Sequence, residues 1–81
     1  MNATKYQIFL KTVECGSFTK AAADLNFSQS GISHAISSLE EELGVTLLSR
    51  NRGGVTLTGD GRALLPQIQQ LCTEYHRLSL I

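Results

Sequence analysis

The 81-residue sequence lacks the patterns that mark disulfide-stabilised, zinc-binding and membrane-spanning proteins. It has only two cysteines, Cys15 and Cys72, which lie far apart and form no CxxC pair, so neither a disulfide framework nor a zinc site is expected. No signal-peptide pattern is present, and no run of about 18 apolar residues could cross a bilayer. We therefore predict a cytoplasmic protein with no membrane, metal or cofactor, in which both cysteines are small packing residues.

Groupings of catalytic residues are missing as well. Cys15 and His34 belong to different predicted helices, and no third residue is placed to orient them as a nucleophile and its base. The consecutive acids Glu40–Glu42 cannot all converge on one substrate, and no glycine-rich phosphate loop is present. These absences predict that the chain is not an enzyme.

The chain has a formal net charge of zero, because seven Lys and Arg residues balance seven Asp and Glu residues. This balance counts against nucleic-acid binding, in which neutralisation of phosphates usually supplies much of the affinity. The distribution matters more than the sum: no Lys or Arg lies between Lys20 and Arg50, and three acids cluster at Glu40–Glu42. Positive charge is therefore expected before and after the middle of the chain. Three other basic residues are predicted to lie on solvated faces: Lys5, Lys11 and Arg77.

The middle of the chain, from Ser28 to Gly44, predicts an amphipathic helix. Its aliphatic residues recur with the spacing of one helical face: Ile32, Ile36, Leu39 and Leu43. The opposite face carries only short hydrogen-bonding side chains: Gln29, Ser30, Ser33, His34 and Ser37. Ser28 suits the N-cap, and Gly44 suits a left-handed end. Such a face can approach another surface closely, but by itself it is equally consistent with a solvent-facing side.

Two shorter helices are predicted before this one. Residues 4–15 place apolar side chains on one face, and a second helix over 18–25 follows the break at Gly16 and the capping residue Ser17. The small inner residues Ala21 and Ala22 would let another helix cross closely. Only Asn26 and Phe27 separate this helix from the next, which predicts a helix-turn-helix.

After Gly44 the pattern changes to two β-strands, predicted over Val45–Arg50 and Val55–Leu57 and joined by residues 51–54. A two-stranded ribbon after a helix-turn-helix is called a wing. Arg52 lies at its tip and Arg50 at its base, where arginine could reach a phosphate backbone or a narrow minor groove. The alternatives are that Arg52 is only a solubilising loop residue and that Arg50 pairs with one of Glu40–Glu42.

A long helix is predicted from Thr58 to Ile81, about 35 Å in length. Its apolar residues step by four and three, the spacing of a coiled-coil seam: Leu64, Ile68, Leu71, Tyr75 and Leu78. Pro66 should kink this helix or mark a fresh start. Because the helix is too long to be covered by residues 1–57, and because so short a chain buries little surface, we expect it to dimerise with a second copy. The apolar end of the chain suggests that more protein normally follows.

A resemblance to a known family is carried by these segments, in chain order: Gly16-Ser17-Phe18-Thr19-Lys20-Ala21-Ala22, Ser28-Gln29-Ser30, Ile32-Ser33, Leu39-Glu40-Glu41-Glu42-Leu43-Gly44-Val45, Leu47-Leu48, Arg50, Leu57-Thr58 and Gly61. The pattern resembles the amino-terminal domain of LysR-type transcriptional regulators over essentially the whole chain. The resemblance implies a mainly α fold: a winged helix-turn-helix of three helices plus a two-stranded wing over residues 1–57, then a linker and dimerisation helix over 58–81. The family's effector-binding domain is absent from this chain, so any small-molecule effector would act only through that domain.

The resemblance also implies which residues meet double-stranded DNA. Thr19 and Lys20 would contact phosphate, and Arg50 and Arg52 would belong to the wing. The start of the recognition helix and its polar face would supply the remaining contacts, to base edges and nearby phosphates: Ser28, Gln29, Ser30, Ser33, His34 and Ser37. The chain departs from the family pattern with serine at position 30, and with His34 and Ser37-Ser38 where cations are common.

Side-chain chemistry separates these candidates. The Gln29 amide can accept a hydrogen bond from adenine N6 and donate one to N7, whereas Ser30 and Ser33 can meet either a base or a phosphate. His34 could meet a phosphate, a guanine acceptor or nothing. We predict a homodimer that binds an interrupted inverted repeat. The rival is a winged-helix module that dimerises or binds proteins and reads no DNA sequence, as zero net charge and a helix poor in cations would suggest.

Overall fold

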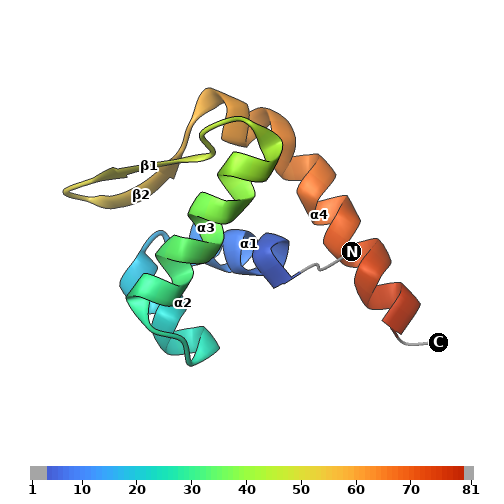
Figure 1. The fold of residues 1–81 in the computed structure, drawn as a ribbon, viewed down its shortest axis with the longest axis horizontal. Helices are drawn as coiled ribbons and strands as arrows, with labels where there is room; N and C mark the ends of the chain where they lie inside the picture. The colour runs from blue at the N-terminus through green and yellow to red at the C-terminus, as the bar shows by residue number, and fades with distance from the viewer. Residues whose placement is uncertain (1–3, 80–81) are drawn as a thin grey trace.

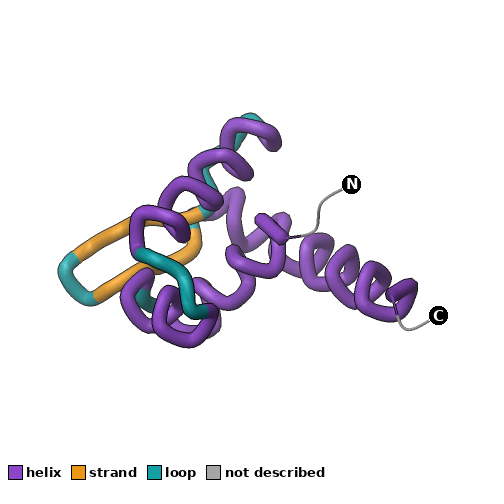
Figure 2. The backbone as a smooth tube through the Cα atoms, turned by 60° about the horizontal axis from the view of Figure 1, so that its bottom comes forward, coloured by secondary structure: helices purple, strands orange, loops and turns teal. Residues whose placement is uncertain are grey.

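The structure, a computed structural model, describes residues 4–79 and confirms a mainly helical chain with one small sheet (Figure 1). Its elements follow in chain order: α1 Thr4–Cys15, α2 Phe18–Leu25, α3 Gln29–Leu43, β1 Leu48–Asn51, β2 Gly54–Leu57 and α4 Gly59–Ser79. The first three helices form the body of the domain, the strands project as a hairpin, and α4 leaves the body at one side (Figure 2). This is the predicted winged helix-turn-helix followed by a long helix.

The core lies between the first three helices and is completed by the segment before the wing. Phe9 of α1, Ile32 and Leu39 of α3 and Leu47 are fully buried. Ala21 is fully buried as well, because a methyl side chain lets the neighbouring helices approach α2 closely. The predicted apolar stripe of α3 is confirmed except at its last member, since Leu43 is 36% exposed.

Capping residues set the helix ends where the sequence predicts them. The Ser17 hydroxyl accepts a hydrogen bond from the Lys20 backbone N–H at 3.3 Å, and the Ser28 hydroxyl accepts one from the Gly31 N–H at 3.0 Å. Asn26 takes the left-handed conformation, with φ 60°, and thereby ends α2. The connection between α2 and α3 is as short as predicted, and this shortness gives the helix-turn-helix its shape.

The wing is an antiparallel pair in which Leu48 faces Leu57 and Asn51 faces Gly54. The prediction that the first strand begins at Val45 is wrong, because residues 45–47 form an irregular segment. The Val45 N–H donates to the Glu40 carbonyl at 3.2 Å, and the Leu47 N–H donates to the Glu40 carboxylate at 2.6 Å. The backbone N–H groups of Val45 and Leu47 are therefore bound to Glu40, so they are not available to pair with a second strand.

The long helix α4 is confirmed, with Thr58 as its capping residue: the Thr58 hydroxyl oxygen accepts from the Gly61 N–H at 3.0 Å. Gly61 is buried, and a Cβ on it would lie 2.2 Å from the Leu47 carbonyl oxygen, so only glycine allows this approach. The helix continues through Pro66 without a break, so the predicted fresh start is wrong. Residues 80–81 of the predicted helix lie outside the described residues.

Candidate nucleic-acid interface

The polar face of α3 is the largest candidate site. Helical geometry puts its five side chains within an arc of about 140° that lies opposite the buried Ile32, Ile36 and Leu39. Four of the five are exposed and Ser33 is half-buried: Gln29, Ser30, Ser33, His34 and Ser37. Among the residues that the structure describes, the side chains of Gln29, Ser33, His34 and Ser37 have no hydrogen-bond or ion-pair partner. They are therefore free to bind another molecule.

The serines at the start of α3 differ from these free side chains. The Ser28 oxygen caps the helix and also lies 3.2 Å from the Ser30 hydroxyl, so the two serines form one hydrogen-bonded pair. This arrangement fixes the first turn of α3 and leaves the Ser30 hydroxyl exposed. Ser28 thus has a structural role as the N-cap in addition to its predicted place at the interface.

The supporting helix α2 presents its first turn to solvent. Thr19 and Lys20 are both exposed, next to the capping residue Ser17. Phe27, in the turn before α3, is 46% exposed. It is not among the predicted interface residues, because those all have polar side chains. An exposed phenyl ring next to Ser28 and Gln29 adds an apolar contact surface to this end of the interface.

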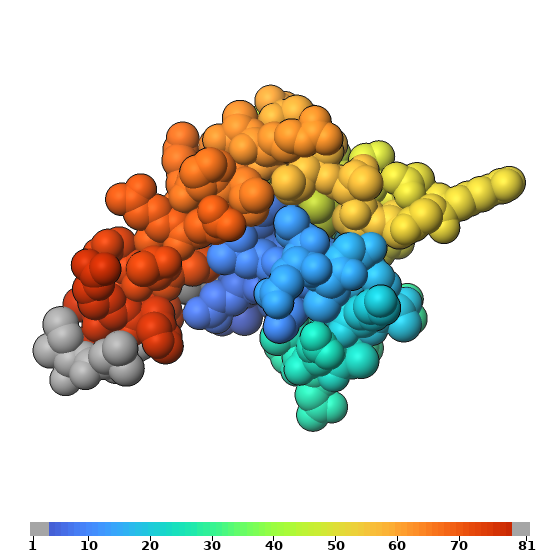
Figure 3. Space-filling view, turned by 180° about the vertical axis from the view of Figure 1, so that it is seen from behind, coloured from blue at the N-terminus to red at the C-terminus, as the bar shows by residue number. Residues whose placement is uncertain are grey.

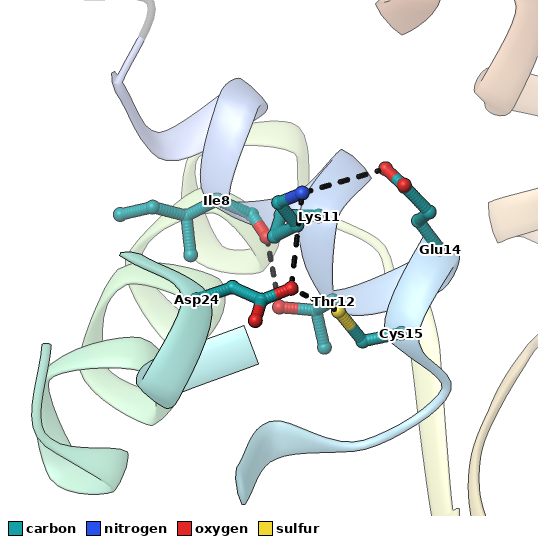
Figure 4. A network of polar contacts seen from close by, with 6 residues as sticks. All are labelled: Ile8, Lys11, Thr12, Glu14, Cys15 and Asp24. Atoms are coloured by element: carbon teal, nitrogen blue, oxygen red, sulfur yellow. Dashed lines mark hydrogen bonds and ion pairs between the residues drawn. The ribbon is translucent and has the colours of Figure 1, made fainter. Parts of the chain in front are cut away.

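A set of polar contacts ties α2 to α1 (Figure 4). The Lys11 ammonium lies 3.9 Å from an Asp24 carboxylate oxygen and 3.8 Å from one of Glu14, so the prediction that Lys11 is merely solvated is wrong. The Cys15 thiol donates to the same Asp24 oxygen at 3.5 Å. Partial burial and this hydrogen bond raise the pKa of the Cys15 thiol, so it remains a protonated donor.

The tip of the wing is a two-residue turn at Arg52 and Gly53. The Asn51 side-chain oxygen accepts a hydrogen bond from the Gly53 N–H at 3.0 Å, which stabilises the turn. Arg52 is exposed at this tip and pairs with no acid among the described residues. The turn that contains it is the free end of the hairpin, which projects from the body of the domain (Figure 1).

Arg50 behaves differently from Arg52. Its guanidinium carbon lies 3.7 Å from the centre of the Phe18 ring, at the start of α2. The alternative that Arg50 pairs with one of Glu40–Glu42 is therefore wrong. Stacking on an aromatic face suits the planar guanidinium group and attaches the base of the wing to the helix-turn-helix.

Ion pairing divides the basic residues into two groups. Lys5, Lys11 and Arg77 have acidic partners, the last of them Glu74 at 3.5 Å. Within residues 4–79 the other four basic residues pair with no acid: Lys20, Arg50, Arg52 and Arg62. All four are exposed, and they include Lys20 on α2, which packs against α3, and Arg52 in the wing turn. Their charges are not neutralised by neighbouring acids, although the net charge of the chain is zero.

The acids of α3 lie at the C-terminal end of its polar face, where exposed Glu41 falls within the same arc, one turn after Ser37. Glu42 forms an ion pair with Lys5 at 2.9 Å, and the Lys5 ammonium also donates to Ser38 at 3.2 Å, so Lys5 is not a merely solvated residue as predicted. The Glu40 carboxylate accepts hydrogen bonds from two backbone N–H groups. α3 has 15 residues and is about 22 Å long, which keeps these acids far from Gln29 and Ser30.

The predicted seam of α4 has two parts. Ile68 is 4% exposed and packs in the chain's own core, with Leu64 against the same core. Leu71, Tyr75 and Leu78 lie farther along the helix, and the last two are 40% and 68% exposed. Tyr6 and the exposed Leu43 border a shallow apolar hollow beside Leu71, so an apolar strip continues along α4.

No cluster of three or more His, Cys, Asp or Glu side chains that could hold a metal ion occurs in the part of the chain that the structure describes. Both cysteines are free thiols, and partial burial raises the pKa of Cys72. None of the described helices is long and apolar enough to cross a membrane.

Comparison with known proteins shows which family this chain resembles. Residues 4–62 match the family model described as "Bacterial regulatory helix-turn-helix protein, lysR family". The chain is 44% identical over 72 residues to the HTH-type transcriptional regulator YvbU of Bacillus subtilis, covering 88% of this chain and 25% of YvbU. It is 48% identical over 71 residues to the probable HTH-type transcriptional regulator LrrA of Synechococcus elongatus, covering 88% of this chain and 24% of LrrA.

A solved structure agrees with these relatives. The crystal structure of the CbnR_DBD–DNA complex matches with a TM-score of 0.90 and 32% identity, over 98% of this chain and 91% of that one. Our chain thus spans about a quarter of the length of the curated relatives it matches, but nearly all of this smaller solved chain.

Proposed function

Because this chain belongs to the lysR family of bacterial regulatory helix-turn-helix proteins, we propose that it binds double-stranded DNA in a sequence-specific manner as a transcriptional regulator. The observation that carries the proposal is the exposed polar face of α3 with its free side chains, together with two exposed, unpaired cations, Lys20 on α2 and Arg52 on the wing. A helix with this face fits the major groove, where base edges present donors and acceptors. We propose no catalytic step for this chain.

In the proposed complex each part of the chain has its own task. Residues 1–57 read DNA: the N-terminal half of α3 enters the major groove, Thr19 and Lys20 meet phosphates, and the wing meets the flanking backbone or minor groove. Residues 58–81 dimerise through the apolar strip of α4. Two α3 helices would then enter grooves about 34 Å apart, so the operator is an interrupted inverted repeat.

Two further parts of the proposal concern the protein in its cell. The proposed site of action is the cytoplasm, where bacterial DNA lies. A small-molecule effector would bind a separate domain outside this chain, as the size of the relatives suggests, because our chain corresponds to about a quarter of each.

The test of the proposal is a binding selection of the 81-residue chain against a random duplex pool at about 50 and 150 mM salt. Enrichment of an interrupted inverted repeat is the expected result, and it would supply the operator at once. Binding without enrichment would contradict sequence-specific reading by α3. No binding at either salt would favour the rival, a protein-interaction module.

Replacing Gln29 by alanine is expected to relax specificity at one operator position. The Gln29 side chain is exposed and has no partner in the described structure, so its amide is available to a base pair. A bidentate contact discriminates by about 1–3 kcal/mol, so preference at that position should fall roughly 5- to 150-fold. Competition binding against all four base pairs measures this. Gln70→Ala, an exposed glutamine of α4, is the matched control and should change no preference.

Replacing Arg52 by alanine is expected to weaken binding to all duplexes alike, roughly 3- to 10-fold, because one solvent-exposed phosphate contact worth about 1 kcal/mol is lost. The slope of log K against log salt should become flatter by about 0.9. A titration from about 50 to 200 mM salt measures both quantities. An unchanged slope would mean that Arg52 meets no phosphate. Arg77→Ala removes the same charge from the far end of α4 and should leave the slope unchanged.

A further inference from the structure

We propose that Arg50 is a positioning residue, which holds the wing against the start of α2 so that Arg52 and α3 reach the same duplex together. The proposal rests on the DNA-binding function above. It assigns Arg50 a role different from that of a wing arginine in contact with phosphate. Two contacts at the junction of the wing and the helix-turn-helix support it, together with a glycine that permits the second of them.

The first contact is the stack of Arg50 on Phe18. The guanidinium carbon lies 3.7 Å from the ring centre, and Phe18 is itself only 9% exposed. The ring is therefore fixed in the core, and the arginine that covers it is fixed in turn. Because Phe18 is the first residue of α2, the contact links the wing directly to the helix-turn-helix, whose second helix α3 carries the polar face.

The second contact joins the other strand to the turn after α1. The Val55 N–H donates to the Gly16 carbonyl at 3.1 Å. Figure 3 shows this turn lying against the base of the wing, while the tip extends beyond the body of the domain. Arg50 and Val55 are directly opposite each other in the strand register, so both strands are attached at the same level.

The third feature is the absence of a side chain at Gly54. Its φ of +123° suits glycine, and a Cβ on it would lie 2.4 Å from the Gly16 carbonyl oxygen. The close approach of wing and turn therefore depends on glycine at this position. A two-stranded hairpin alone is marginally stable, so these contacts are what can fix its direction.

The geometry makes the direction of the wing important. About four residues separate the start of β1 from Arg52, which is roughly 13 Å at the rise of a β-strand. A tilt of about 15° at the base would move the tip by about 3 Å, the length of a hydrogen bond. Loss of the Arg50 stack should therefore remove the Arg52 contact even though Arg52 is unchanged.

The experiment is a double-mutant cycle between Arg50→Gln and Arg52→Ala, with affinity for the selected operator as the readout. Arg50→Gln alone should reproduce most of the 3- to 10-fold loss predicted for Arg52→Ala, and it should cost less than about 1.5-fold more in the Arg52→Ala background. Gly54→Ala keeps both arginines and disturbs the same junction, so it should weaken binding in the same way. Arg62→Gln removes one unpaired arginine elsewhere and serves as the charge control.

Amide hydrogen exchange on the free protein gives a readout that does not depend on DNA. The Val55 amide should exchange faster in Arg50→Gln, because the wing opens more often at its base, and should be unchanged in Arg62→Gln. An unchanged Val55 rate in Arg50→Gln would overturn the proposal. So would an equal loss of affinity from Arg50→Gln with and without Arg52, because that result identifies Arg50 as an independent DNA contact.

These outcomes separate the positioning role from the function on which it rests. If the unaltered protein binds no duplex, the proposed function fails, and the Val55 exchange rate still decides whether Arg50 holds the wing. If the protein binds its operator and the two substitutions are additive, only the positioning role fails.

Discussion

Replacing Leu71 by aspartate is expected to convert the proposed dimer into monomers and to lower affinity for a two-half-site duplex about 100-fold or more. Leu71 lies at the centre of the apolar strip on α4, between the hollow that includes Tyr6 and Leu43 and the exposed Tyr75 and Leu78. A charge there would have to be buried without a partner in the dimer. Two monomers would then bind the two half-sites independently, so the gain in affinity that comes from linking the two binding events is lost.

Sedimentation of the free protein and titration of a two-half-site duplex measure the two effects. Gln70→Asp places the same charge at the neighbouring exposed position and should change neither. Because Leu71 is outside the buried core, the variant should keep its fold, which circular dichroism can verify. A Leu71→Asp protein that sediments as a dimer would show that the interface lies elsewhere on the chain.

Replacing Glu40 by alanine is expected to lower the free energy of unfolding by about 2–3 kcal/mol. One oxygen of the half-buried Glu40 carboxylate accepts from the backbone N–H groups of Leu47 at 2.6 Å and Leu48 at 3.2 Å. Without that acceptor, two donors beside the fully buried Leu47 lose their partner. For a domain of this size the melting temperature should fall by roughly 10–20 °C.

Two comparisons sharpen this prediction. Glu41→Ala removes an exposed acid with no partner in the described structure and should change the melting temperature little. Glu40→Gln keeps a neutral acceptor and should cost less than Glu40→Ala. All variants should be melted at one protein concentration, because dimerisation would stabilise each of them. A melting temperature unaffected by Glu40→Ala would mean that the carboxylate does not hold residues 45–47.

The helices and their caps could be predicted from the sequence because their determinants are local. Ser17, Asn26, Ser28 and Gly44 end or begin helices through bonds to residues only a few positions away. The apolar spacing of α3 likewise separates the buried Ile32 from the polar face around Gln29. The same local patterns predicted a long helix after the wing and a turn within residues 51–54, although Asn51 and Gly54 belong to the strands. The motifs of the whole chain identified the family.

Local patterns could not predict the partners of charged side chains. Lys5 and Glu42 are 37 positions apart and pair only because α1 packs against α3. Arg50 is close to the acids Glu40–Glu42 in sequence, yet it stacks on Phe18, which is distant in sequence. In both cases the spacing along the chain does not predict the partner of the charged side chain, because that partner depends on how separate elements pack.

By itself, the sequence determined which segments are helices and strands, where the first three helices begin and end, and which family they form, because capping and periodicity act within a few residues. Only the tertiary structure decided that Glu40 holds the segment before the wing, that Arg50 lies on Phe18, and that Ile68 belongs to the chain's own core. These contacts join separate parts of the fold, over seven residues for Glu40 and Leu47 and over much longer stretches for Arg50 and Phe18. Long side chains such as those of Glu40 and Arg50 can reach several partners, and only packing selects among them.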